Sequence, residues 1–300
     1  MKKVIVICGP TASGKTKLGI EVANKIGGEI ISADSMQIYK DMDIGSAKPT
    51  KDEREKAVHH LIDFVSPDKR YSVADFKRDA SNKIERIIGE NKTPIIVGGT
   101  GLYIDSLVYN IEFNEEKTDL EYRELLDKEE TSKLYELANK IDEVSTKKVS
   151  QNDRKRLMRI IEIYHSTGKT KYELEEESRK KVKYDYRIFI LNMEREKLYD
   201  RINQRVDKMI EEGLIDEVKK LLEKYKEFPT AMQGLGYKET VQYLRGELTK
   251  EEMIDKIKQE SRRYAKRQLT WFRRYKNAVW LDAKNSNNAN IIMEDIGEEK

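Results

Sequence analysis

Short apolar runs alternate with stretches of helical periodicity over much of the chain. Five runs of four to six residues are bounded by glycine, proline or charged residues. We expect these runs to form buried strands, at residues 4–8, 29–33, 94–97, 186–191 and 278–282. Strands that alternate with helices indicate a parallel sheet covered by helices, which places the chain in the α/β class.

Helical periodicity is clear between these runs. Residues 17–26 follow a glycine-rich turn directly. A second helix is predicted to begin after Ser72 and to run to Ile88, with Ser72 and Asp75 forming an aspartate version of the capping box. Residues 196–225 are predicted to form one long helix, and the polar residues from 285 onwards are expected to be frayed.

The character of the sequence changes at about residue 112. Residues 112–130 contain nine acidic and three basic residues with few apolar positions. Helical periodicity continues from there to about residue 178, without the pattern of a buried strand. We therefore expect residues 112–179 to form an all-helical domain, inserted into an α/β core of residues 1–111 and 180–300.

The turn after the first apolar run has the spacing of a phosphate-binding loop, G-x-x-x-x-G-K-[ST]. In such a loop the backbone N–H groups surround phosphate oxygens, and the N-terminus of the following helix adds a positive field. The lysine supplies a charge, and the hydroxyl of Thr16 suits Mg²⁺. The predicted loop residues are Gly9, Pro10, Thr11, Ala12, Ser13, Gly14, Lys15 and Thr16. By itself this loop would suggest ATP or GTP.

Two more turns follow predicted strands. Asp34 follows one of them, and a second glycine-rich turn, residues 98–101, contains Thr100. The carboxyl ends of parallel strands share one edge of the sheet, where ligands bind. Asp34 is therefore a candidate for chemistry as well as for a turn, and Thr100 for a contact with a phosphate or an attacking group as well as for a helix cap. The absence of an apolar strand that ends in a Walker B aspartate argues against simple nucleotide hydrolysis.

Positive charge is locally concentrated, although the net charge is only +3. Residues 255–276 carry nine Lys or Arg and two acids, interleaved with four aromatic residues. Such a helix is typical of proteins that bind a nucleic-acid backbone. Arg201 and Arg205 are spaced to point the same way on one helix, where they would clamp a polyphosphate or pair with neighbouring acids.

Composition excludes several classes of protein. No apolar stretch reaches the ~18–20 residues of a membrane span, and the first apolar run is too short for a signal peptide. We therefore expect a cytoplasmic protein without a membrane partner. The single cysteine, Cys8, excludes an internal disulfide and a zinc-ligand cluster.

In their order along the chain, these motifs resemble the tRNA dimethylallyltransferase family in its short bacterial form. The resemblance covers nearly the whole chain. Besides the phosphate-binding loop, the motifs that carry it are residues 34–39, 45–49, 59–63, 98–103, 152–156, 233–239 and 267–272. It implies a P-loop NTPase-like core that binds a diphosphate rather than ATP, and a helical insertion that grips the tRNA anticodon stem-loop.

The resemblance also implies a reaction. The family transfers a dimethylallyl group from dimethylallyl diphosphate to N6 of adenosine 37, in tRNAs that read codons beginning with U. The product is N6-(dimethylallyl)adenosine. The expected cofactor is Mg²⁺, and the expected state is a monomer.

Roles are implied for the residues that match the family. Asp34 matches the general base, and Thr100 matches a threonine where tRNA and diphosphate meet. The groups that match stabilisers of the leaving diphosphate are Lys15, Ser13, Thr16 and Arg205. The residues that match tRNA contacts are Asp34, Ser35, Met36, Gln37 and Thr100 in the core, and Arg123, Lys155, Arg156, Leu157, Met158 and Arg159 in the insertion.

Three other functions share part of this pattern. An adenylate isopentenyltransferase, which acts on free AMP, ADP or ATP, would share the loop and Asp34 but would not need residues 154–159 or the basic helix. A small-molecule kinase would need a nucleoside pocket and lid arginines. An RNA-binding module without catalysis would leave Asp34 and both glycine-rich turns unexplained.

Overall fold

The computed structural model describes residues 1–113 and 119–297. The chain divides into two compact units, one formed by Met1–Ile104 with Tyr184–Lys300 and the other by Asp105–Lys183. The second unit begins at residue 105 and ends at residue 183. The expected insertion ran from residue 112 to residue 179, so the observed unit is longer at both ends. Part of the acidic stretch, residues 114–118, lies outside the described residues.

The described residues of the first unit form a six-stranded sheet, in the order β3-β2-β4-β1-β5-β6. Every adjacent pair of strands is parallel, which confirms the α/β class. The strands are β1 (Lys3–Cys8), β2 (Glu29–Ala33), β3 (His59–His60), β4 (Pro94–Gly98), β5 (Asp185–Asn192) and β6 (Val279–Asp282). Because β4 lies between β1 and β2, the turns after these three strands are neighbours at one edge of the sheet.

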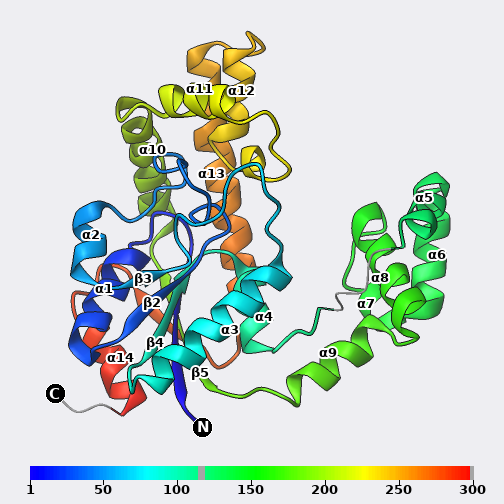
Figure 1. Ribbon diagram of the computed structural model, residues 1–300, viewed down its shortest axis with the longest axis horizontal. Helices are drawn as coiled ribbons and strands as arrows, with labels where there is room; N and C mark the ends of the chain where they lie inside the picture. Colours follow the sequence, from blue (N-terminus) through cyan, green and yellow to red (C-terminus); the bar gives the residue numbers. More distant parts are fainter. Residues whose placement is uncertain (114–118, 298–300) are drawn as a thin grey trace. The chain divides into compact units, whose positions relative to one another are not determined.

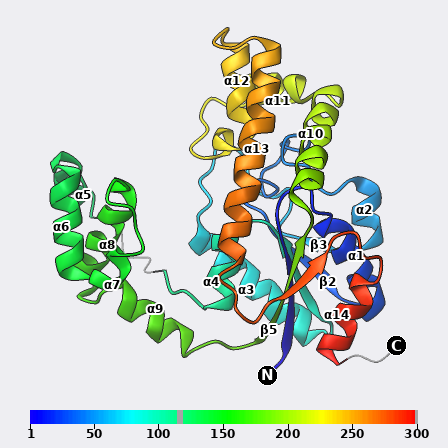
Figure 2. The same cartoon turned by 180° about the vertical axis from the view of Figure 1, so that it is seen from behind.

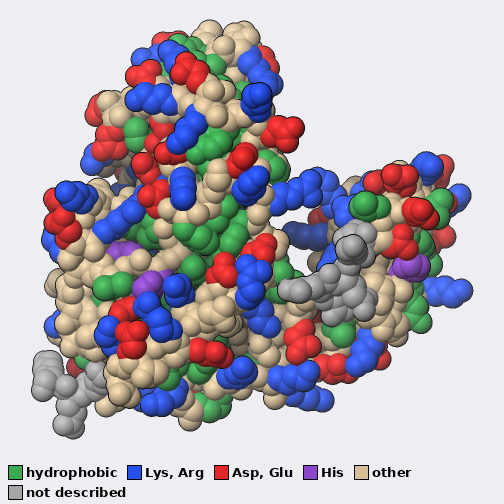
Figure 3. All heavy atoms as spheres, in the orientation of Figure 1, with side chains coloured by type: hydrophobic (Ala, Val, Ile, Leu, Met, Phe, Trp, Pro, Cys, Tyr) green, Lys and Arg blue, Asp and Glu red, His purple; other side chains and the backbone are tan. Residues whose placement is uncertain are grey.

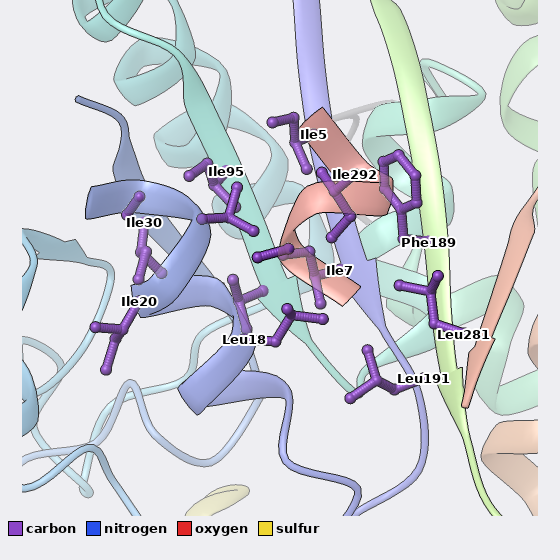
Figure 4. Close-up of a cluster of buried hydrophobic side chains, with 14 of the residues drawn as sticks. Ile5, Ile7, Leu18, Ile20, Ile30, Ile95, Phe189, Leu191, Leu281 and Ile292 are labelled. Carbon is purple, nitrogen blue, oxygen red and sulfur yellow. The ribbon is translucent and has the colours of Figure 1, made fainter. Parts of the chain in front are cut away.

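Helices α1 (Lys15–Ile26) and α14 (Asn288–Ile296) cover one face of the sheet (Figure 1). Buried apolar side chains of the strands, such as Ile5 and Phe189, pack there against Leu18 and Ile292 (Figure 4). The expectation that the chain is frayed from residue 285 was wrong. Ile292 and Ile296 lie at helical spacing, so this short helix has an apolar face that is buried against the sheet.

The opposite face is covered by α3 (Val73–Gly89) and α4 (Gly101–Val108) (Figure 1). The predicted capping box at the start of α3 is present, since Ser72 and Asp75 each accept a backbone hydrogen bond from the other. Phe76 of α3 stacks on Tyr103 of α4, with 4.0 Å between the ring centroids. This contact fixes the start of α4, and with it the glycine-rich turn that leads into the helix.

Four helices stand beyond the carboxyl ends of the strands (Figures 1 and 2). They are α10 (Arg195–Glu211), α11 (Leu214–Lys224), α12 (Tyr237–Leu244) and α13 (Lys250–Phe272). The prediction of one helix over residues 196–225 was wrong. Gly213 has φ +98°, a left-handed conformation that ends α10 and lets α11 start in a new direction. This packing buries Val206, Leu214 and Ile257 in a second apolar cluster.

Two short elements complete the first unit, α2 (Lys51–Lys56) and the 3₁₀ turn η1 (Ala231–Gln233). On the face of the molecule shown in Figure 3, Lys and Arg side chains are interspersed with Asp and Glu. No helix in the described part of the chain combines the length and apolar character needed to cross a membrane.

The second unit is helical over its described residues. Its helices are α5 (Leu120–Lys128), α6 (Thr131–Ile141), α7 (Glu143–Thr146), α8 (Arg154–Thr167) and α9 (Lys171–Arg179). It has an apolar core of its own, in which Leu126, Leu134 and Ala138 surround the buried side of α8.

Candidate active site

A cavity of about 620 Å³ opens in the first unit, where β1, β2 and β4 end. Helices α10 and α13, the loop of residues 45–49 and residues 233–238 supply much of the remaining lining. Six basic side chains line the cavity, namely Lys15, Lys17, Arg201, Arg205, Lys238 and Arg267. The acidic side chains of the lining are Asp34 and Glu53. The excess of positive charge favours an anionic ligand.

The phosphate-binding loop joins β1 to α1 and depends on unusual backbone conformations. Gly9 has φ +148°, and a Cβ there would lie 2.5 Å from the carbonyl oxygen of Leu191. Gly14, at the start of α1, has φ +94°, and Ala12 has φ +62°. Only glycine combines the first conformation with so close an approach of the chain. The spacing of glycines in the sequence therefore has a direct structural cause.

Two cations lie beside this loop. The Lys15 ammonium donates a hydrogen bond to the Pro10 carbonyl (2.7 Å), and the Arg205 guanidinium donates one to the Thr11 hydroxyl (3.3 Å). Burial, followed by the nearby charge of Arg205, lowers the pKa of Lys15 to about 8. Burial also lowers the pKa of Arg205. Neither side chain has an ion-pair partner within 4.0 Å among the described residues, so two partly buried cations make a strong site for an anion.

Hydroxyl groups complete the loop. Ser13 Oγ is buried and has no hydrogen-bond partner within the described residues, so it is available to a ligand. Thr16 lines the cavity. The described residues contain no group of three or more His, Cys, Asp and Glu that would hold a metal ion. Thr16 therefore fits Mg²⁺ only if most of the ion's oxygen ligands come from a bound diphosphate and water.

Asp34 lies directly after β2 and faces this positive site. Its Oδ1 accepts hydrogen bonds from the backbone N–H groups of Met36 (2.9 Å) and Gln37 (3.4 Å). One carboxylate oxygen thus makes the turn that the residue type favours. In the described part of the chain, Oδ2 has no hydrogen-bond partner. The aspartate therefore shapes the turn and still offers an oxygen to the cavity.

Thr100 does not cap α4 through its side chain. Its hydroxyl accepts a hydrogen bond from the backbone N–H of Ser35 (3.0 Å), and its own N–H donates to the Ala33 carbonyl (3.1 Å). Both bonds join the turn after β4 to the turn after β2. The structure therefore brings Thr100 and Asp34 together, as their positions after parallel strands predict.

Ser35, Met36 and Gln37 also line the cavity. The Gln37 amide is held internally, since its nitrogen donates to the Ala47 carbonyl (3.1 Å) and its oxygen accepts from the Ser32 hydroxyl (3.0 Å). Ser35 and Met36 are the members of this predicted contact set whose side chains have more freedom to meet a ligand.

The loop that contains Ala47 is fixed by Glu217 of α11, a residue that sequence reasoning missed. Its carboxylate accepts hydrogen bonds from the N–H groups of Asp43 (2.9 Å), Ile44 (2.8 Å) and Gly45 (3.1 Å). It also accepts one from the Tyr237 hydroxyl (2.8 Å). Nothing in the local sequence around Glu217 indicates such a role, because all four partners come from elsewhere in the chain.

Sequence reasoning also missed the function of Gln268 in α13, although the residue lies within one of the motifs that resemble the family. Its side-chain oxygen accepts a hydrogen bond from the Thr11 N–H (2.8 Å), and its nitrogen donates to the Gly99 carbonyl (2.9 Å). Tyr264, one turn earlier, lines the same cavity. Burial raises the pKa of Tyr264 to about 12, so its hydroxyl stays protonated at neutral pH.

The basic residues of α13 divide into two groups. Lys258 pairs with Asp207 (2.6 Å) and Arg262 with Asn203 (2.6 Å), which holds α13 against α10. The exposed group comprises Arg263, Lys266 and Arg267 of α13, with Arg273 and Arg274 directly after its end. The whole stretch was predicted to contact nucleic acid, but the first group is used for packing.

In the second unit, Arg123 and Arg159 lie on either side of Glu162, at 3.4 and 3.7 Å. Arg156 pairs with Asp153 (3.3 Å), and Lys155 is exposed. The four basic side chains that were predicted to contact tRNA therefore all reach the surface of the second unit.

Leu157 and Met158 were expected among the tRNA contacts, but their side chains are not available for one, so a contact at these positions would come from the backbone. They are 0% and 3% exposed and belong to the apolar core of the second unit. On a helix, two adjacent residues on the buried side cannot also face a ligand in solution. Their side chains stabilise α8 from inside.

The chain was compared with known families and structures. The family described as IPP transferase matches residues 37–275, and that described as Isopentenyl transferase matches residues 2–66. A curated tRNA dimethylallyltransferase from Acetivibrio thermocellus is 52% identical, over 94% of this chain and 92% of the relative.

Solved structures give the same result. The tRNA delta(2)-isopentenylpyrophosphate transferase of Staphylococcus epidermidis is 43% identical, with a TM-score of 0.74 over all of both chains. A eukaryotic dimethylallyltransferase acting on tRNA is 33% identical, with a TM-score of 0.86 over all of this chain and 81% of the other.

Proposed function

The chain belongs to the IPP transferase family, and on that premise we propose that it transfers the dimethylallyl group of dimethylallyl diphosphate to tRNA. The acceptor is N6 of adenosine 37 in tRNAs that read codons beginning with U, and the products are N6-(dimethylallyl)adenosine and diphosphate. The observation that carries the proposal is the placement of Asp34, with a carboxylate oxygen free for a ligand, in a cavity whose other charged side chains are mostly basic. This transfer needs a general base close to the groups that bind the diphosphate.

In the proposed reaction the adenine N6 attacks C1 of the dimethylallyl group. The C1–O bond breaks and its electron pair leaves with the diphosphate, while N6 gives up one proton to the Asp34 carboxylate. An exocyclic amine is a poor nucleophile, so a carboxylate within hydrogen-bond reach contributes typically ~10²–10⁴-fold to the rate. N6 is shielded in a stacked base, so the adenine enters the cavity flipped out of the anticodon loop.

The leaving diphosphate is held by the phosphate-binding loop. Lys15 and Arg205 neutralise its developing charge, and Ser13 with the backbone N–H groups of the loop donates hydrogen bonds. Thr16 would hold Mg²⁺ together with the diphosphate, and the ion would supply further charge neutralisation there. The bond that breaks is carbon–oxygen, so the site does not need the water-positioning groups of an ATPase.

The tRNA is bound by residues of both units, and those of the first unit lie at the cavity and on α13. Ser35, Met36 and Thr100 at the cavity meet the anticodon loop, and the exposed basic residues of α13 meet its backbone. In the second unit the contacts come from Arg123, Lys155, Arg156 and Arg159. We propose that the protein acts as a monomer, and a tRNA substrate implies a location in the cytoplasm.

Free AMP is the competing acceptor, because an adenylate isopentenyltransferase would use the same loop and base. The tRNA-specific names of relatives that match nearly the whole chain favour tRNA. The test is to incubate the protein with labelled dimethylallyl diphosphate and Mg²⁺, and with tRNA or AMP in separate reactions. We expect label in tRNA at adenosine 37. Label in AMP alone would replace the proposal by its alternative.

A further inference from the structure

Gln268 connects the two glycine-rich turns of the active site. It is 5% exposed and lies on α13, which begins far from both turns in the sequence. Its amide oxygen accepts from the N–H of Thr11 in the phosphate-binding loop, and its amide nitrogen donates to the carbonyl of Gly99 in the second turn. A single planar group therefore sets the distance between the two loops.

The contact is closely fitted on both sides. A Cβ at Gly99 would collide with the Gln268 amide nitrogen, and a Cβ at Gly101 would collide with the Trp271 ring, which also belongs to α13. A side chain at Gly99 or Gly101 would therefore displace Gln268 or Trp271 from its present position. The second turn rests directly on α13 at two points, one hydrogen-bonded and one apolar.

Gln268 is also one link in a longer series of hydrogen bonds. Arg205 donates to the side chain of Thr11, whose backbone N–H donates to Gln268. On the other side of Gln268, the Gly99 carbonyl is followed directly by Thr100, whose hydroxyl binds the N–H of Ser35. The series thus runs from a cation of the proposed diphosphate site to the residue beside the proposed base.

We propose that Gln268 is a positioning residue that sets the spacing between the diphosphate loop and the turn that holds Thr100. This inference rests on the proposed function. In a transfer between two bound substrates, the reacting atoms must approach to ~3–3.5 Å, and a misplacement of ~1 Å can cost ~10²-fold in rate. Gln268 lines the cavity, but its amide oxygen and nitrogen are both bonded to the two turns. It therefore acts on the chemical step and leaves the affinity for each substrate nearly unchanged.

The test uses two substitutions in the full-length protein. Gln268→Met has a similar length and removes both hydrogen bonds. Gln268→Glu keeps an acceptor for Thr11, but as a carboxylate it cannot donate to the Gly99 carbonyl. A protonated carboxyl has one donor and one acceptor, so it restores both bonds. The activity of Gln268→Glu relative to the wild type should therefore rise as the pH is lowered.

Single-turnover rates are measured with both substrates saturating, at pH 6 and pH 8, together with the Kd of each substrate and the melting temperature. For Gln268→Met we expect a loss of about 10- to 100-fold in rate at both pH values, with each Kd within about threefold of the wild type. For Gln268→Glu we expect a similar loss at pH 8, because the carboxylate cannot donate to the Gly99 carbonyl, and a smaller loss relative to the wild type at pH 6.

Gln242→Met is the matched control, since Gln242 accepts a hydrogen bond from Lys256 of α13 (3.0 Å) and lies outside the cavity lining. It should keep the wild-type rate. A single-turnover rate for folded Gln268→Met within threefold of the wild type would overturn the proposal. An equal loss of rate in Gln242→Met would also overturn it. So would a loss of rate in Gln268→Met that weaker binding of either substrate explains. If Gln268→Met does not fold, a rate for Gln268→Glu at pH 8 within threefold of the wild type overturns it. Failure of the wild-type protein to modify tRNA would refute the proposed function instead.

Discussion

The hydroxyl oxygen of Thr100 lies 3.0 Å from the backbone nitrogen of Ser35 and accepts its hydrogen bond. This bond links the turn after β4 to the turn after β2, and it fixes the backbone immediately after Asp34. Thr100 was expected to contact a phosphate or an attacking group, or else to cap a helix. The structure gives the hydroxyl a third role, which is to hold the proposed base in position.

Thr100→Val tests this role, because it keeps the shape of the side chain and removes the acceptor for the Ser35 N–H. We expect the single-turnover rate of tRNA modification to fall about tenfold or more, since the Asp34 turn is less well held. Thr100→Ser retains the hydroxyl and should stay within about threefold of the wild type. Equal rates for the Val and Ser variants would show that the bond to Ser35 does not matter for the reaction.

Asp34→Asn tests the general base. The amide oxygen can still accept from the N–H groups of Met36 and Gln37, so the turn should be preserved. We expect the rate to fall by about 10²–10⁴-fold, because the amide cannot take the proton from N6. The affinity for tRNA, measured by filter binding, should change by less than about threefold. A variant that binds tRNA poorly but turns over normally once bound would contradict this role.

The pKa of Lys15 leads to a prediction about pH. Burial lowers this pKa to about 8, so the ammonium loses its proton as the pH rises above that value. A bound diphosphate favours the charged form and raises the pKa again. The affinity for dimethylallyl diphosphate should therefore fall as the pH is raised from 7 to 9, which calorimetry can measure.

Lys15→Arg is the control for the pH dependence. A guanidinium remains charged over this range, so the affinity of the variant should be nearly independent of pH even if it is weaker overall. The same slope in the wild type and in Lys15→Arg would assign the titration to another group.

The division of basic residues on α13 gives a prediction about salt. Replacing Arg263, Lys266 and Arg267 together by Gln should weaken tRNA binding and reduce the slope of log K against log salt by about 2 to 3. Arg262→Gln should leave the slope unchanged within about 0.5, because Arg262 is bonded to Asn203, and should lower the melting temperature instead. An unchanged slope in the triple variant would mean that this surface does not bind tRNA.

The elements of the fold that depend on local pattern were predictable from the sequence. The apolar runs became β1, β2, β4, β5 and β6, and the Ser72 capping box formed as expected. The two errors came from helix boundaries. Gly213 divides the predicted long helix into two. The last helix was not predicted, because the residues around Ile292 and Ile296 are mostly polar and hid their helical spacing. Gly213 ends α10 through its left-handed conformation, whereas α14 is stabilised by packing of its apolar face against the sheet.

The sequence by itself determined the phosphate-binding loop and the placement of Asp34 and Thr100 at one edge of the sheet. Glycine spacing and the order of strands are local properties, and parallel strands must end on the same side. Only the tertiary structure decided that Leu157 and Met158 face inward, that Arg262 is used for packing, and that Gln268 joins the two loops. Gln268 is 257 residues from Thr11 and 169 from Gly99, and hydrogen bonds between such distant segments leave no periodic signal in the sequence.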